Sequence, residues 1–184
     1  MRHAQLLFLI CLLAAVTGPT LASGQDANSA RAFLQDAYGH YARGGEGISL
    51  YGPLAKQYFH SSLIMLVQAH DKALGSDLGE LDGDLVCSCM DWGGIFDLKI
   101  DIQIENSQRA IANARFALYE GKDRDKDSWR KLKFTLVPEH GRWRIWDITD
   151  YSNPELVYSV REEISDDINF HAKNSKGHTA KPSS

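Results

Sequence analysis

The chain has 184 residues, of which 43% are hydrophobic and 24% are charged, and its formal net charge is −4 at pH 7. This length and apolar content suit one domain with its own hydrophobic core, rather than a miniprotein that depends on disulfides. Because nucleic-acid-binding proteins usually carry clustered basic residues, the acidic balance excludes a large phosphate-binding surface and predicts no nucleic acid among the partners.

The first 22 residues have the organisation of a secretory signal peptide. Arg2 and His3 precede an apolar run at residues 6–16, and small residues follow it. The run has about eleven residues, well short of the roughly twenty that a membrane-spanning helix needs. We expect cleavage after Ala22, which predicts a periplasmic or secreted protein without a transmembrane segment.

Two helical regions begin the mature chain. At residues 29–41 apolar side chains recur at intervals of three and four, which predicts an amphipathic helix capped by Asp26 or Asn28. A second apolar stripe at helical spacing covers residues 53–75 and contains the polar sequence 60–62, where we expect a bend.

Two cysteines lie one residue apart in an acidic, glycine-rich segment, residues 75–94, that predicts an irregular loop. Removal of the signal peptide, which contains Cys11, leaves Cys87 and Cys89 as the only cysteines. In an exported protein, thiols this close favour a disulfide that holds a tight turn. A reducible bond with a redox role and a metal site stay open as alternatives, although redox pairs usually have two intervening residues.

The carboxylates of this loop do not follow a metal-binding pattern. A calcium loop places glycine sixth and glutamate twelfth, and a count based on Gly83 puts Cys89 in the twelfth position. No histidine pattern accompanies the thiols. We therefore predict no metal and no cofactor.

Four strands are expected after the loop. Strict alternation at residues 96–104 predicts the first, and a turn leads to a second at 109–119, whose alanines share one face. A second hairpin joins residues 129–137 to 142–148. Helices followed by meandering strands predict an α+β domain in which N-terminal helices cover a curved antiparallel sheet.

Asn153 and Pro154 predict the start of a C-terminal helix. Its apolar stripe would consist of Leu156, Val157, Val160 and Ile164. The polar residues 172–184 are predicted to form a disordered tail, so the single domain comprises residues 23–171.

The sequence Gly-Arg-Trp-Arg-Ile-Trp-Asp-Ile at residues 141–148 resembles the closing strand of the cone-shaped fold of nuclear transport factor two. Together with residues 50–59, 81–84 and 87–92, it also resembles the exported bacterial domain-of-unknown-function family numbered three-eight-two-eight. The likeness covers residues 30–164. The family implies no established reaction, and it carries over only recurring positions without catalytic roles: Asp84, Cys87, Cys89, Asp91, Trp92, Trp143 and Asp147.

A cone of this kind offers a cavity between helices and sheet. The acid-base candidates there are Asp91, His70, Asp147 and His60, although His70 is more economically explained as a buried or rim histidine with a backbone partner and Asp147 as an acceptor for the backbone N–H groups of a neighbouring loop. The residues that could line a pocket are aromatic, although large aromatic residues are first of all explained as core residues: Trp92, Tyr58, Trp143 and Trp146.

No coherent catalytic set accompanies these residues. The sequence therefore favours an exported, non-catalytic domain that binds a small molecule or a protein partner such as another envelope protein. The alternative is a small hydrolase or isomerase that uses an aspartate and a histidine at the mouth of the cone. An open sheet face also permits a homodimer.

Overall fold

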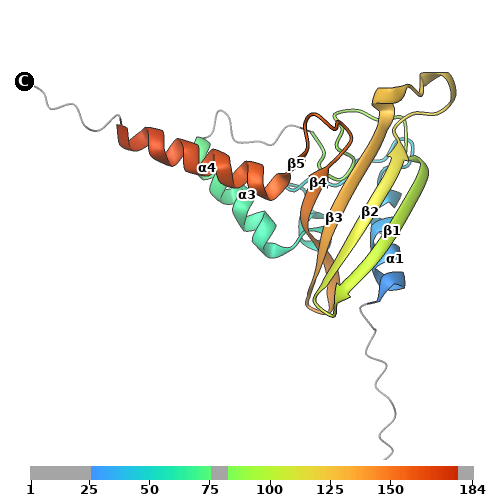
Figure 1. Cartoon of the computed structure of the whole chain (residues 1–184), viewed down its shortest axis with the longest axis horizontal. Helices are drawn as coiled ribbons and strands as arrows, with labels where there is room; N and C mark the ends of the chain where they lie inside the picture. The colour runs from blue at the N-terminus through green and yellow to red at the C-terminus, as the bar shows by residue number, and fades with distance from the viewer. Residues whose placement is uncertain (1–25, 76–82, 178–184) are drawn as a thin grey trace, which may run out of the picture.

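The structure is a computed structural model, and it describes residues 26–75 and 83–177 (Figure 1). Within them, three α-helices precede the sheet and one follows it: α1 (Ala27–Gly39), α2 (Ala55–Tyr58), α3 (Ser61–Leu74) and α4 (Val160–Gly177). The strands pair antiparallel in chain order: β1 (Phe96–Asn106), β2 (Arg109–Ala117), β3 (Trp129–Glu139), β4 (Arg142–Asp150) and β5 (Tyr158–Ser159). The predicted α+β class is confirmed, whereas the predicted signal peptide, residues 1–22, lies outside the described residues.

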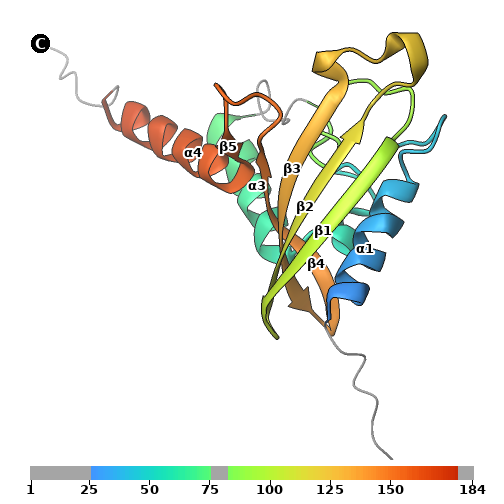
Figure 2. The same cartoon turned by 45° about the vertical axis from the view of Figure 1, so that its right-hand side comes forward.

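The core forms where α1 lies against one face of the sheet (Figure 2). The alanines of β2 are buried on this face and leave room for the helix: Ala110, Ala112 and Ala114. Tyr38 of α1 packs edge-on, with its ring centroid 5.0 Å from that of Phe116 and 6.2 Å from that of Phe134. Tyr38 therefore joins α1 to β2 and β3 through aromatic contacts.

The second predicted helical region is divided into α2 and α3 close to the expected bend. His60 lies between them in extended conformation, and its Nδ1 accepts a hydrogen bond from the Ser62 amide at 3.1 Å. The His60 amide in turn donates to the Ile145 carbonyl of β4 at 2.9 Å. The break therefore ties α2 and α3 to the sheet.

α3 and α4 pack side by side next to β4 and extend away from the sheet (Figures 1 and 2). α4 continues to Gly177 and so enters the segment from residue 172 that was predicted to be a tail. No helix in the described part of the chain is long and apolar enough to cross a membrane.

The predicted start of the last helix at Asn153 is wrong. Residues 158–159 pair with β4 as the short strand β5, and α4 begins only at Val160. The Ser159 hydroxyl accepts from the Glu162 amide at 3.3 Å, so the sequence Ser-x-x-Glu supplies the capping signal that Asn153 was expected to supply. Leu156 and Val157 accordingly lie outside the helix and are exposed, whereas Val160 and Ile164 are buried.

A tight turn joins β3 to β4. Glu139 pairs with Arg142, and the two residues between them, His140 and Gly141, have φ angles of +51° and +73°. Two left-handed residues in succession form the turn type whose twist matches that of the flanking strands. The turn thereby fixes the position at which β4 begins.

Candidate functional site

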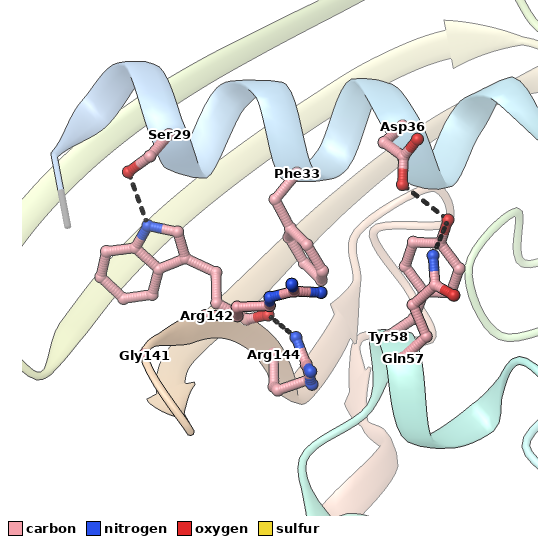
Figure 3. Close-up of a pocket in the computed structure, with 9 residues that line it drawn as sticks. Ser29, Phe33, Asp36, Gln57, Tyr58, Gly141, Arg142 and Arg144 are labelled. Atoms are coloured by element: carbon pink, nitrogen blue, oxygen red, sulfur yellow. Dashed lines mark hydrogen bonds between the residues drawn. The ribbon is translucent and has the colours of Figure 1, made fainter. Parts of the chain in front are cut away.

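A cavity of about 260 Å³ lies between α1, α2 and the β3–β4 turn (Figure 3). Three segments far apart in the sequence line it: Ser29, Phe33, Asp36, Gln57, Tyr58, Gly141, Arg142, Trp143 and Arg144. Tyr58 and Trp143, both predicted from the sequence as pocket residues, are thus brought together by the fold.

One part of the cavity wall is aromatic. The Phe33 and Tyr58 rings lie with their centroids 5.8 Å apart. Trp143 is only 3% exposed, and its indole Nε1–H donates to the Ser29 hydroxyl at 3.0 Å. That hydrogen bond satisfies the indole and fixes its orientation against α1.

A second part of the wall is a hydrogen-bond network around the Tyr58 hydroxyl. This hydroxyl donates to Asp36 Oδ2 at 2.7 Å, receives the Gln57 amide at 3.1 Å and lies 2.8 Å from His40 Nε2. Burial, followed by the hydrogen bond and the charge of Asp36, raises the pKa of Tyr58 to about 12. Tyr58 is therefore a neutral donor at physiological pH and not a general base.

The third part of the wall is basic. Arg144 Nη1 donates to the Trp143 carbonyl at 2.8 Å, whereas its Nε–H is buried without an acceptor among the described residues. Burial lowers the pKa of Arg144, and the charge of Arg142 lowers it further against an opposing effect of Glu139. Within the described part of the chain, neither guanidinium has a carboxylate within 4.0 Å.

The other two predicted pocket residues lie elsewhere. Trp92 lines a separate cavity of about 290 Å³ and packs its ring 5.4 Å from that of Tyr41. Two guanidinium groups lie over the Trp146 ring, that of Arg109 at 5.7 Å and that of Arg161 at 4.2 Å from the ring centroid. Trp146 thus supports the packing of α4 beside the sheet rather than the first cavity.

His70 does not contact the other acid-base candidates. It is 3% exposed, and its Nε2 lies 3.3 Å from Asp167 Oδ2 on α4, so its partner is a carboxylate and not the expected backbone group. His70 Nδ1 is buried without a hydrogen-bond partner among the described residues, 3.8 Å from Asp71 Oδ1. Its contacts are those of a residue between α3 and α4.

The aspartate candidates serve local structure. Asp147 accepts from the Ser159 hydroxyl at 2.8 Å and from the Arg161 amide at 3.1 Å, so it holds the start of α4, in keeping with the role of loop acceptor. Asp91 is exposed and accepts from the Trp92 amide at 2.8 Å. The structure therefore brings neither aspartate together with His70.

Asp84 organises the loop that carries the cysteines. Its carboxylate receives the Tyr41 hydroxyl at 2.6 and 2.7 Å, the Ile48 amide at 3.0 Å and the Val86 amide at 2.8 Å. Burial raises the pKa of Asp84 against the effect of these donors. This recurring position of the resemblance is thus a structural acceptor that joins the loop to the segment after α1.

Sequence reasoning missed the other seven lining residues of the cavity: Ser29, Phe33, Asp36, Gln57, Gly141, Arg142 and Arg144. A signal existed on α1, since Ser29, Phe33 and Asp36 follow one another at intervals of four and three and so share a helix face. The helix was predicted from its apolar stripe. A face that mixes polar and aromatic residues indicates that the helix also borders something other than the core.

Comparisons with known proteins give the chain no family. No protein-family model and no solved structure matches it. A 90-residue part is 32% identical to the uncharacterized protein YqhG of Escherichia coli (strain K12), and the match covers 49% of this chain and 28% of that protein. The chain thus spans little more than a quarter of the relative, whose description states no activity.

Proposed function

We propose that this protein is an exported, non-catalytic domain that holds a small molecule in the cavity between Tyr58 and Trp143. The observation that carries the proposal is the convergence of aromatic walls, hydrogen-bonding groups and two guanidiniums from three separate segments. Cavities of mainly apolar lining with a few directed polar groups are the usual form of small-molecule sites.

The proposal includes a cone-shaped fold like that of nuclear transport factor two and membership of the exported family named above. Its support is architectural: a helix against one face of an antiparallel sheet, with the cavity at the junction of helices and strands. Fold likeness alone assigns no chemistry, so the function depends on the cavity.

Export and the Cys87–Cys89 disulfide belong to the same proposal. The two Cα atoms lie 5.2 Å apart, within the range that a disulfide bridges. The intact mass of protein recovered from the periplasm tests both points: we expect a chain that begins at Ser23 and weighs two hydrogen atoms less than its reduced form. A full-length, reduced chain would contradict them.

A hydrolase or isomerase is not favoured, because Asp91, His70 and Asp147 have separate structural partners. Turnover of ester, peptide or glycoside substrates by the purified protein, abolished by Asp91→Ala, would reverse this preference.

The binding proposal is tested by screening small molecules against the ¹⁵N-labelled mature protein. We expect binders to shift the indole N–H signal of Trp143, assigned with Trp143→Phe, and to leave that of Trp146 in place. A screen whose hits never shift the Trp143 signal, or a protein partner that covers the cavity instead, would refute small-molecule binding there.

A further inference from the structure

The two arginines of the cavity have unused hydrogen-bonding capacity. Their guanidiniums both lie below Phe33, on the side of the cavity opposite α1 (Figure 3). Arg142 forms no side-chain hydrogen bond or ion pair within the described residues, and Arg144 uses only Nη1, for the Trp143 carbonyl. Most donors of both forks therefore remain for another molecule.

Neither guanidinium has a carboxylate within 4.0 Å among the described residues, although the charge of Glu139 acts on Arg144 from a greater distance. Asp36 is the one acidic residue in the described lining, and its Oδ2 is engaged by the Tyr58 hydroxyl. Burial is the main cause that lowers the pKa of Arg144, the charge of Glu139 opposes it, and the charge of Arg142 lowers this pKa further. The buried Nε–H of Arg144 has no acceptor among the described residues, so this side chain has a further donor that is not satisfied.

We propose that this cavity recognises the acidic group of its ligand, a carboxylate or a phosphate, through Arg142 and Arg144. The inference rests on the proposed function and names its ligand class. A planar carboxylate or a phosphate accepts two parallel hydrogen bonds from a guanidinium fork, and an amide or an alcohol does not.

Size and lining define the rest of the ligand. At about 30 Å³ for each water-sized group, a cavity of about 260 Å³ holds roughly nine non-hydrogen atoms. The rings of Phe33, Tyr58 and Trp143 suit an apolar or aromatic body beside the acidic group. The class is thus a small acid of about the size of a single ring with one acidic substituent.

The test uses four probes on the mature protein: benzoate, phenyl phosphate and the neutral analogues benzamide and benzyl alcohol. Binding is followed at the Trp143 indole N–H signal. We expect the two acids to bind and the neutral analogues to bind at least tenfold more weakly, with the ratio of benzoate to phenyl phosphate identifying the preferred acidic group. Added salt weakens only the acids.

Arg144→Gln and Arg142→Gln are each expected to weaken the acids about tenfold and to leave the neutral analogues unchanged. Arg144→Lys keeps a charge but loses the fork, so it should also weaken benzoate. Arg43→Gln is the matched control, since Arg43 is exposed and lies outside the cavity lining. Arg142 is exposed as well, so its variant is expected to fold even if the Arg144 variants do not.

Four results distinguish failure of the acidic-ligand inference from failure of the proposed function. Neutral analogues that bind as tightly as the acids, or acid binding unchanged in Arg142→Gln, would overturn the acidic-ligand inference and leave the binding function standing. If the acids fail to shift Trp143 while other compounds do so, this inference alone fails. If neither these probes nor the screened molecules shift the Trp143 signal, both the acidic-ligand inference and the proposed binding function fail.

Discussion

A single hydroxyl, that of Tyr58, connects the helices on one side of the cavity. Its partners come from three places: Asp36 of α1, His40 just after it and Gln57 of α2. Because of these polar contacts, Tyr58 holds both its own ring and the Asp36 side chain in a fixed position beside the aromatic wall.

Tyr58 should titrate later than an ordinary tyrosine. Because its pKa is raised in the folded state, its stabilising contribution is complete below about pH 10 and is lost as the pH rises through about 12. The difference in phenolate absorbance between the wild type and Tyr58→Phe should therefore show a titration near pH 12. A difference centred near 10 would contradict the buried network.

Within the described part of the cysteine loop, we expect replacement of Asp84 to destabilise the protein most. In Asp84→Ala the Tyr41 hydroxyl and the amides of Ile48 and Val86 lose a charged acceptor, which we expect to lower the free energy of unfolding by about 3 kcal/mol. Asp91→Ala, in the same loop but exposed, is the control and should change it by less than about 0.5 kcal/mol. Urea denaturation measures both.

Asp84 should also make the stability of the folded protein depend on pH. The pKa of Asp84 is raised from its ordinary value of 3.8 by burial, so the folded state holds the proton more tightly than the unfolded state. Its contribution is present below 3.8 and is lost as the pH rises through the folded-state pKa. The stability of the wild type should accordingly fall relative to Asp84→Asn as the pH rises from acid to neutral; a rise would contradict the direction of the shift.

Among the elements, α4 shows how a helix boundary depends on its partners. Asp147 of β4 receives the Ser159 hydroxyl and the Arg161 amide, while the Ser159 oxygen also accepts from Glu162. The helix therefore begins where side chains of strand and helix satisfy its first amides.

Ser159→Ala should remove this arrangement. We expect it to lower the free energy of unfolding by about 1–2 kcal/mol, because a helix cap and a partner of Asp147 are lost together. The control is Asn153→Ala at the predicted but unused start, whose side chain accepts from Glu155 in an exposed turn. Denaturation curves that coincide for the two variants would show that Ser159 does not cap α4.

For the molecule as a whole, one continuous core includes the cysteine loop. Cys87 is fully buried and Cys89 nearly so, in the same apolar cluster as Val86, α1 and the sheet. The loop is therefore part of the domain and should unfold with it in a single transition.

Reduction of the proposed disulfide should weaken the domain without unfolding it. A closed loop of three residues is short, so its chain-entropy contribution amounts to about 1.5 kcal/mol. We expect dithiothreitol to lower the urea midpoint of the wild type and to leave that of the double variant Cys87→Ala, Cys89→Ala unchanged. An equal response of both proteins would exclude the disulfide.

Much of the fold was predictable because its signals are local. The alternation at residues 96–104, the apolar spacing at 29–41 and Gly75 after the last turn of α3 all correspond to elements of the structure. The start of α4 could not be predicted in this way, because Asn153-Pro154 and Ser159-x-x-Glu162 are both acceptable helix starts. Only the pairing of β5 with β4 selects the second.

The residues that line the cavity were predictable only in part. An aromatic residue shows the same sequence pattern whether it packs in a core or lines a cavity. Tyr58 and Trp143 lie in the lining of one cavity, whereas two arginines lie over the Trp146 ring. Arg142 and Arg144 appeared in sequence as ordinary strand residues beside Trp143.

Periodicity and composition were thus sufficient for the class of the domain and for its four long strands, because residues close in sequence decide these features. The candidate site required tertiary structure. Trp143 and its partner Ser29 are 114 positions apart, and only the packing of α1 on the sheet brings them together. Whether a side chain is core or cavity wall depends on what lies opposite it, and that neighbour comes from a distant part of the chain.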